Sequence, residues 1–278
     1  MPWQLLDQDS SEGRCMVKLK ADWSTTNKEI YERESSWGFR DPDHFYERFY
    51  RQMIRDFFGL SPSFKILDLG CGDGFYLQWF AREANAFGQD IASAYIEQQL
   101  GPVLMQQFKS GDASTIQFPG GFFDGVFLNH VIEHVDKDST DAVIQEIHRV
   151  LKPGGKLFVA TPNRFSLAEL FLDVTFQGGR RIETGHANIM TPTTLRALLE
   201  RNGFHIQRLC SRSVLFFPSG LNLPIIGRYM TGYPALVLLS RTSARAAVAM
   251  MNFDLYLSSK EPFRKLGFDV IALCRKKG

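Results

Sequence analysis

A glycine-rich segment and two aspartates are placed where a bound nucleoside could be held. The segment ILDLGCGDG (66–74) runs from apolar residues into glycines at 70, 72 and 74. Such glycines let bare backbone approach a ligand at the end of a strand. Asp90, 20 positions after Gly70, closes the next apolar segment, where a carboxylate can accept hydrogen bonds from both ribose hydroxyls. Asp112 follows a third segment, where a side chain reaches an adenine edge. Together these residues predict a nucleoside site at three strand ends.

The same residues taken singly have simpler interpretations. Glycines also serve ordinary turns, and an isolated aspartate is more often a solvated loop residue. A dinucleotide-binding fold is another alternative, but its G-x-G-x-x-G pattern requires glycine at position 75, which is Phe75. A nucleotide-dependent oxidoreductase is therefore disfavoured.

Three histidines supply the remaining candidate chemistry. His130 and His134 lie in HVIEH directly after a fourth apolar segment, and His186 precedes a predicted helix. H-x-x-E-H is also a zinc-protease signature, which needs both histidines on a helix and a third ligand. Because the pattern here lies at the end of a strand, we exclude the protease. A lone loop histidine such as His186 can also be a solvated or capping residue.

Alternating strand and helix signals surround these residues and predict a parallel sheet covered on both faces. The expected strands are 64–69, 86–91, 103–108, 124–128, 156–161, 204–210 and 269–274. The expected helices are 75–85, a stretch ending at 100, 142–151, and one that starts at Thr191 and ends at Gly203. The predicted fold class is α/β, a Rossmann-like, doubly wound, mostly parallel seven-stranded sheet with a helical insertion before the last strand.

Composition suggests four segments along the chain. In the first, helical spacing over 27–58 is marked by apolar residues every four positions, namely Phe45, Phe49, Met53 and Phe57. The expected segments are an N-terminal arm and helical region (1–58), the core (59–213), a helical cap or insertion (214–267) and the last strand of the core (268–278).

The insertion has two interpretations. Prolines and glycines interrupt its apolar residues, which argues against a spanning helix. It is either a helical cap that completes the core, or an apolar roof over a lipid-like acceptor or a patch that rests on a membrane surface. We favour the cap.

Charge and cysteine content exclude several classes of protein. Lys and Arg number 32 against 30 acidic residues, so the net charge is +2 and no basic stripe predicts a nucleic-acid partner. The four cysteines form no C-x-x-C pair, which argues against a zinc site or a disulfide framework and favours the cytoplasm. We expect no signal peptide and no transmembrane segment, because neither apolar pattern is present.

Six stretches together resemble class I S-adenosylmethionine-dependent methyltransferases of the type 11 group. They are ILDLGCGDG (66–74), FGQD (87–90), SGDA (110–113), FDGVFLNHVIEHV (123–135), LKPGGKLFVATPN (151–163) and GHANIMTPTTLRALLERNGF (185–204). The resemblance covers about residues 60–210 and is specific as a set. It implies a glycine loop around the methionine end of the cofactor, a ribose contact at Asp90, adenine contacts at Asp112 and Ala113, and Asn129 beside the cofactor. The full set of implied cofactor contacts is Asp68, Gly70, Cys71, Gly72, Asp90, Ile91, Asp112, Ala113 and Asn129.

The resemblance also implies a reaction and its acceptor class. It predicts transfer of the methyl group of S-adenosylmethionine to a hydroxyl of a small molecule, with S-adenosylhomocysteine as product. The acceptor would be a quinone precursor, a polyketide or a lipid or glycan intermediate, and an apolar acceptor is one of these alternatives. His134, with His130 and His186, would lie nearest the chemistry. The sequence is similar to ubiquinone-type O-methyltransferases, in which an ExxEH arrangement holds a divalent metal. Because His130 stands where that pattern has glutamate, we predict no metal ligands. A non-catalytic cofactor-binding module that regulates a partner remains the alternative.

Overall fold

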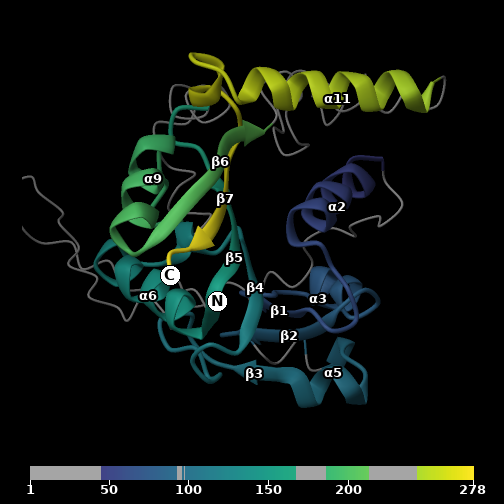
Figure 1. Cartoon of the computed structure of the whole chain (residues 1–278), viewed down its shortest axis with the longest axis vertical. Helices are drawn as coiled ribbons and strands as arrows, with labels where there is room; N and C mark the ends of the chain where they lie inside the picture. Colours follow the sequence, from purple (N-terminus) through teal and green to yellow (C-terminus); the bar gives the residue numbers. More distant parts are fainter. Residues whose placement is uncertain (1–44, 93–95, 97, 167–185, 213–242) are drawn as a thin grey trace, which may run out of the picture.

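A seven-stranded sheet forms the centre of the molecule (Figure 1). The computed structural model describes residues 45–92, 96, 98–166, 186–212 and 243–278. The strand order is β3-β2-β1-β4-β5-β7-β6, and only β7 runs antiparallel to its neighbours. The strands are β1 (Lys65–Leu69), β2 (Asn85–Asp90), β3 (Phe108–Ser110), β4 (Phe123–Asn129), β5 (Leu151–Pro162), β6 (Phe204–Arg212) and β7 (Asp269–Lys276). The predicted α/β, Rossmann-like and mostly parallel fold is confirmed.

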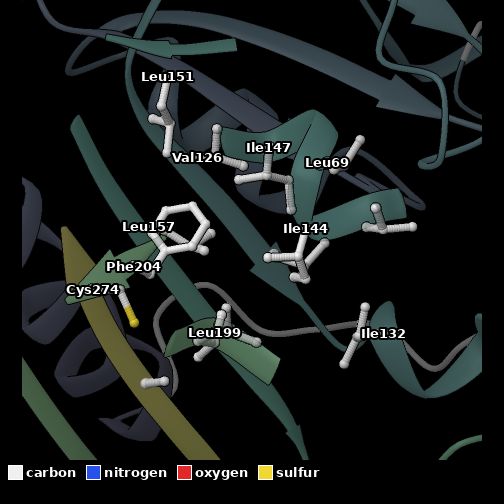
Figure 2. Close-up of a cluster of buried hydrophobic side chains, with 14 of the residues drawn as sticks. Leu69, Val126, Ile132, Ile144, Ile147, Leu151, Leu157, Leu199, Phe204 and Cys274 are labelled. Atoms are coloured by element: carbon white, nitrogen blue, oxygen red, sulfur yellow. The ribbon is translucent and has the colours of Figure 1, made fainter. Parts of the chain in front are cut away.

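Helices cover both faces of this sheet, because alternate strand residues point to opposite sides. One face packs against α2 (Phe45–Phe58), α3 (Phe75–Phe80) and α5 (Pro102–Gln107). The other packs against α6 (Thr140–Val150) and α9 (Pro192–Arg201), whose apolar side chains meet those of β4 and β5 in Figure 2. Burial on both faces explains why these strands read as almost continuous apolar runs.

Helix α2 is the described part of the predicted N-terminal helical region, since residues 1–44 lie outside the described residues. A face with four-residue spacing is fully buried against the sheet and consists of Tyr50, Ile54 and Phe58. The predicted apolar stripe lies one position away and is partly buried at Phe49, Met53 and Phe57. The period was therefore predicted correctly, and the most buried face is its neighbour.

The expected third strand at 103–108 is wrong. Residues Pro102–Gln107 form α5, and the strand that follows, β3, has only three residues (Phe108–Ser110). Proline suits the first turn of a helix because its missing amide would have no partner there. Val103 is 73% exposed, unlike a residue of a strand covered on both faces. Helix α3 is also shorter than expected, because it ends at Phe80 and β2 begins at Asn85.

The predicted start of α9 is confirmed by a capping box. The Thr191 side chain accepts a hydrogen bond from the Thr194 amide at 3.1 Å, and the Thr194 hydroxyl accepts one from the Thr191 amide at 2.8 Å. Pro192 occupies the first turn, as expected. The cap fixes where α9 begins, and the segment that starts at His186 leads directly into it.

The remaining elements lie after β4 and between β6 and β7. Two short 3₁₀ helices, η1 (Ile132–His134) and η2 (Lys137–Ser139), follow β4. Of the predicted insertion, 213–242 lie outside the described residues, and the rest contains α11 (Ala244–Ser258) and η4 (Phe263–Lys265). Within the described ranges, every helix is too short or too polar to cross a membrane.

Candidate functional site

The glycine loop turns from β1 into α3 through three left-handed glycines. Gly70, Gly72 and Gly74 have φ angles of 74°, 54° and 77°, which residues with a side chain rarely adopt. A Cβ at Gly70 would lie 2.2 Å from a methyl group of Val131, whereas a Cβ at Gly72 would meet no atom within 4 Å. The loop is therefore packed at its first glycine and open at its second, where a ligand can approach the backbone.

Asp90 joins this loop to the end of β2. Its carboxylate accepts hydrogen bonds from the Gly72 amide at 2.7 Å and the Ala92 amide at 2.8 Å. Burial raises the pKa of Asp90, although both amide hydrogen bonds favour the charged form. The predicted ribose ligand thus lies against the predicted methionine loop, as a shared nucleoside site requires. Ile91 follows it and is half-buried.

Gln89 connects the ends of β2 and β3 and was not predicted. Its side-chain amide donates to the Asp112 carbonyl at 2.9 Å and accepts from the Gln117 amide at 2.9 Å. The Asp112 carboxylate caps the turn by accepting from the Ser114 amide at 2.7 Å. The available signal in the sequence was a polar residue within an apolar segment. The Gln89 side chain is fully buried, and such a side chain needs hydrogen-bond partners in the fold.

The other implied cofactor contacts lie around the same loop. Asp68 and Cys71 are buried at either side of Gly70, and Ala113 is partly buried against the apolar core on the α6 face of the sheet. Burial, and then the charges of Asp68 and Asp90, raise the pKa of the Cys71 thiol well above its usual range. The thiol therefore stays protonated and is not a nucleophile at neutral pH.

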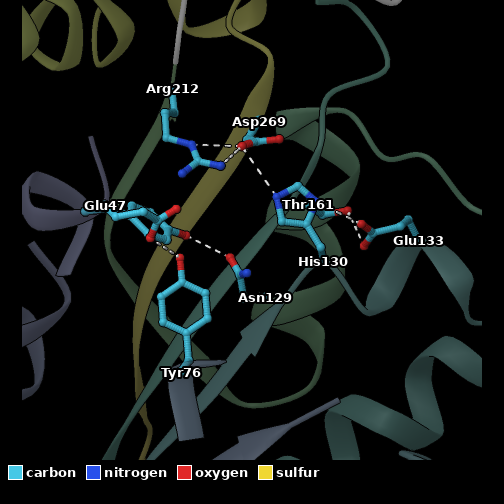
Figure 3. A network of polar contacts seen from close by, with 9 residues as sticks. Glu47, Tyr76, Asn129, His130, Glu133, Thr161, Arg212 and Asp269 are labelled. Carbon is cyan, nitrogen blue, oxygen red and sulfur yellow. Dashed lines mark hydrogen bonds and ion pairs between the residues drawn. The ribbon is translucent and has the colours of Figure 1, made fainter. Parts of the chain in front are cut away.

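Asn129 ends β4 and is held by a residue of α2. The Tyr50 hydroxyl donates to Asn129 Oδ1 at 2.8 Å, and the Tyr76 hydroxyl donates to Glu47 Oε2 at 3.0 Å (Figure 3). One hydrogen bond therefore connects α2 to the end of β4, and the other connects α2 to α3, the helix that follows the glycine loop. Tyr50 was not predicted, because its partner lies 79 residues away in sequence.

His130 lies between two buried carboxylates, as Figure 3 shows. Its Nδ1 is 3.1 Å from Glu133 Oε1, and its Nε2 is 3.5 Å from Asp269 Oδ2. The backbone of His130 is left-handed, with φ of 55°. Burial opposes a charge on the ring, but Asp269 and Glu133 outweigh burial and raise the pKa of His130 to about 9. At neutral pH the ring is therefore an imidazolium held by both nitrogens, which leaves no free lone pair for a base.

Asp269 also pairs with Arg212 at the ends of β7 and β6. Arg212 Nε donates to Asp269 Oδ2 at 2.8 Å, and the guanidinium lies 4.4 Å from the centre of the Tyr50 ring. Burial opposes the negative charge, yet Arg212 and His130 lower the pKa of Asp269 to about 2. We call Glu133, His130, Asp269 and Arg212 the buried ion network.

We expect the buried ion network to make the free energy of unfolding vary with pH in the alkaline range. Because the folded-state pKa of His130 lies above the ordinary value of 6.5, its contribution is complete below pH 6.5 and is lost as the pH rises through about 9. Urea unfolding should therefore give a lower free energy of unfolding above that pH. A His130→Gln variant should show a smaller decline, and equal declines in the two proteins would contradict the expectation.

A second group of side chains, which we call the histidine–glutamate cluster, consists of Glu133, His134 and His186. One ligand atom of each residue lies within 4.8 Å of the others, and the two imidazole rings are 4.9 Å apart. Glu133 also accepts a hydrogen bond from the Thr161 hydroxyl at 3.1 Å. Burial lowers the pKa of His186 to about 4, with Glu133 opposing the shift. His186 is therefore neutral at pH 7, and its lowered pKa makes it a weak base.

The histidine–glutamate cluster can also hold a divalent metal. Two imidazoles and one carboxylate suit zinc or a similar transition metal better than magnesium, which prefers oxygen ligands. His130 does not belong to this ligand set, because its nitrogens face Glu133 and Asp269. The prediction of no metal ligands stays a prediction. If a metal binds here, its third ligand would be His186 and not His130.

Comparison with known proteins identifies relatives of this fold and site. The family described as "Methyltransferase domain" matches residues 43–209. The human mitochondrial ubiquinone biosynthesis O-methyltransferase is 30% identical over 160 residues, covering 51% of this chain and 42% of the relative. The ubiquinone biosynthesis O-methyltransferase of Pseudomonas aeruginosa strain UCBPP-PA14 is 36% identical over 118 residues, covering 38% and 48%. The chain thus spans about half the length of these curated relatives, or slightly less.

Solved structures show the same fold at low sequence identity. An S-adenosylmethionine-dependent methyltransferase from Mesorhizobium loti superposes with a TM-score of 0.52 at 14% identity, covering 82% of this chain and 98% of the other. One from Methanosarcina mazei has a TM-score of 0.54 at 18% identity, covering 81% and 97%. At such identities the likeness establishes the fold alone.

Proposed function

The chain belongs to the methyltransferase-domain family, as a class I S-adenosylmethionine-dependent methyltransferase, and we propose that it transfers a methyl group from this donor to a hydroxyl of a small molecule. The observation that carries the proposal is the 2.7 Å hydrogen bond from the Gly72 amide to Asp90, which brings the glycine loop and the predicted ribose ligand together. Asn129 ends β4, the strand next to β1; Glu133 and His134 follow it in η1, and His186 lies beside His134. The residues that would hold the donor and those that would handle the acceptor's proton thus lie at one sheet edge.

His134 and His186 are the residues we assign to proton transfer. A sulfonium donor supplies an already activated methyl group, so the protein mainly aligns the acceptor and excludes water. A hydroxyl acceptor must also lose a proton, which a neutral imidazole can accept. Glu133 lies beside both rings and stabilises an imidazolium when it forms. His130 is instead a positioning residue in this proposal, because both of its nitrogens already face carboxylates.

We expect His186→Ala to lower kcat by about 100-fold, the lower end of general base catalysis, because His134 remains beside the reacting hydroxyl. Release of S-adenosylhomocysteine would be measured with catechols that carry an apolar chain, and with amines of similar size. The matched control is His205→Ala, since His205 is an exposed histidine of β6. Methylation of amines alone, or equal rates for the two variants, would contradict the proposed role.

A chelator separates the two interpretations of the histidine–glutamate cluster. If the histidines act as a base, treatment with EDTA followed by gel filtration leaves the rate unchanged. If they hold a catalytic metal, the rate falls and added zinc or manganese restores it. The non-catalytic alternative predicts donor binding without release of S-adenosylhomocysteine for any acceptor tested.

The names of the curated relatives support a proposal for the acceptor class. Both curated relatives act in ubiquinone biosynthesis as O-methyltransferases by name. We therefore propose a phenolic hydroxyl on an apolar precursor, a group whose acidity allows a weak base to suffice.

A further inference from the structure

Helix α11 exposes large apolar side chains on one of its faces. Met250, Phe253 and Tyr256 are 40%, 54% and 57% exposed. Their three-residue spacing places them on neighbouring positions of one helix face. The opposite face is the one that packs, because Met251, Asp254 and Ser258 are buried. The core formed by the described residues therefore does not use the outward face.

Basic residues flank this apolar face at both ends. Arg245 lies in the first turn of α11 and is exposed, and Lys260 lies just beyond its last turn with Nζ 5.2 Å from the centre of the Tyr256 ring. Arg264 and Lys265 follow in η4, where they share Glu261 as an ionic partner. Among the described residues of 243–268, the exposed charges are thus three cations (Arg245, Lys260 and Lys265) and one anion (Glu261), and Arg264 is half-buried.

We propose that this face of α11 docks on an anionic lipid surface. A helix lying in a membrane interface buries aromatic and aliphatic side chains to about 5–10 Å, while lysines and arginines at its margins reach the phosphates. Phe253 and Tyr256 supply the aromatic part, and Arg245 and Lys260 supply the margins. A second protein would match the apolar residues equally well, but the excess of cations favours a surface of negative charge.

Helix α11 ends near the strand ends that carry the candidate site. The Asn163 side chain, just after β5, donates to the carbonyls of Lys265 at 2.9 Å and Gly267 at 2.8 Å. β5 ends at the sheet edge where β4 carries Asn129 and His130, so η4 and the end of α11 belong to that edge (Figure 1). Docking would turn this edge toward the lipid. The inference does not require methyl transfer, since lipid binding is measured without turnover.

Vesicle sedimentation tests the inference with the whole chain. The protein should pellet with phosphatidylcholine vesicles that contain phosphatidylglycerol, and less with phosphatidylcholine alone. Binding should weaken in molar salt, where the screening length falls to about 3 Å. The double substitution Phe253→Ser with Tyr256→Ser should weaken binding by at least about tenfold, since two aromatic side chains are no longer buried in the lipid interface. Lys260→Glu should weaken it only on the anionic vesicles.

A matched control is Val103→Ser, which removes an apolar side chain that is 73% exposed on α5 and should leave vesicle binding unchanged. Affinity for S-adenosylhomocysteine, measured on the same preparations, reports whether the variants are folded and tests the methyltransferase proposal separately. Failure of the wild type to pellet with anionic vesicles, or full binding by the double variant, would overturn the inference. So would light scattering that shows a wild-type dimer and a monomeric double variant, because the occupant would then be a second copy.

Discussion

Gly72→Val is expected to weaken binding of S-adenosylhomocysteine by at least about 1000-fold, equivalent to about 4 kcal/mol. A Cβ at Gly72 would meet no protein atom within 4 Å, so the valine side chain would occupy the space in which we place the cofactor. The substitution also forces a β-branched residue to a φ of 54°. The Gly72 amide would then no longer be held against Asp90 in the same geometry. Isothermal calorimetry measures the loss directly.

Gly121→Val is the matched control for backbone strain. Gly121 has a φ of 63° and equally open surroundings, but it precedes β4 at the opposite end of the strand. Both variants should lose a similar amount of thermal stability, of the order of 1–2 kcal/mol, from the left-handed backbone. Only Gly72→Val should lose the ligand. Unchanged affinity in Gly72→Val, or an equal loss in Gly121→Val, would place the cofactor elsewhere.

Asp269→Ala is expected to lower the free energy of unfolding by about 3–5 kcal/mol, because it leaves Arg212 and His130 as buried or half-buried charges without their shared partner. The carboxylate is fully buried, so water does not replace it. Urea unfolding with an unchanged slope would report this as a loss of stability rather than of compactness. His130 should also lose its raised pKa, which removes part of the alkaline pH dependence.

An exposed ion pair provides the control for this prediction. Asp141 pairs with Arg201 at 2.6 Å, but the two side chains are 41% and 55% exposed. Asp141→Ala should therefore cost less than about 1 kcal/mol, since solvent screens the pair. A similar loss for both variants would show that burial of the network around Asp269 adds nothing to stability.

Residue patterns within single segments were enough to predict most of the fold. The loop at Gly70 to Gly74, the capped helix that starts after Thr191 and five of the parallel strands depend on residues close in sequence. The error at 103–108 arose where apolar content was used without the helix-start signal of Pro102. That segment is half-exposed beside the edge strand of the sheet. A short apolar run in such a place does not show whether the segment is a strand or a helix.

The candidate site divides in the same way. Asp90 and Asp112 could be placed because each follows its own strand, and parallel strands end at one edge. Gln89, Tyr50 and Asp269 were missed because their roles depend on partners outside their own segment. His130 was predicted beside the chemistry, but sequence could not show that both its nitrogens face carboxylates.

By itself the sequence indicated a nucleoside site, since strand-end glycines and acids at set intervals define one through local geometry, and the resemblance of six stretches to a known family indicated the class of protein. Tertiary structure alone decided which histidines meet. β7 inserts antiparallel between β5 and β6, so Asp269 arrives opposite Arg212 and beside His130, 139 residues from it in sequence. The same folding leaves His186 next to His134. Contacts between such distant residues depend on the packing of the whole sheet, and no periodicity within a segment encodes them.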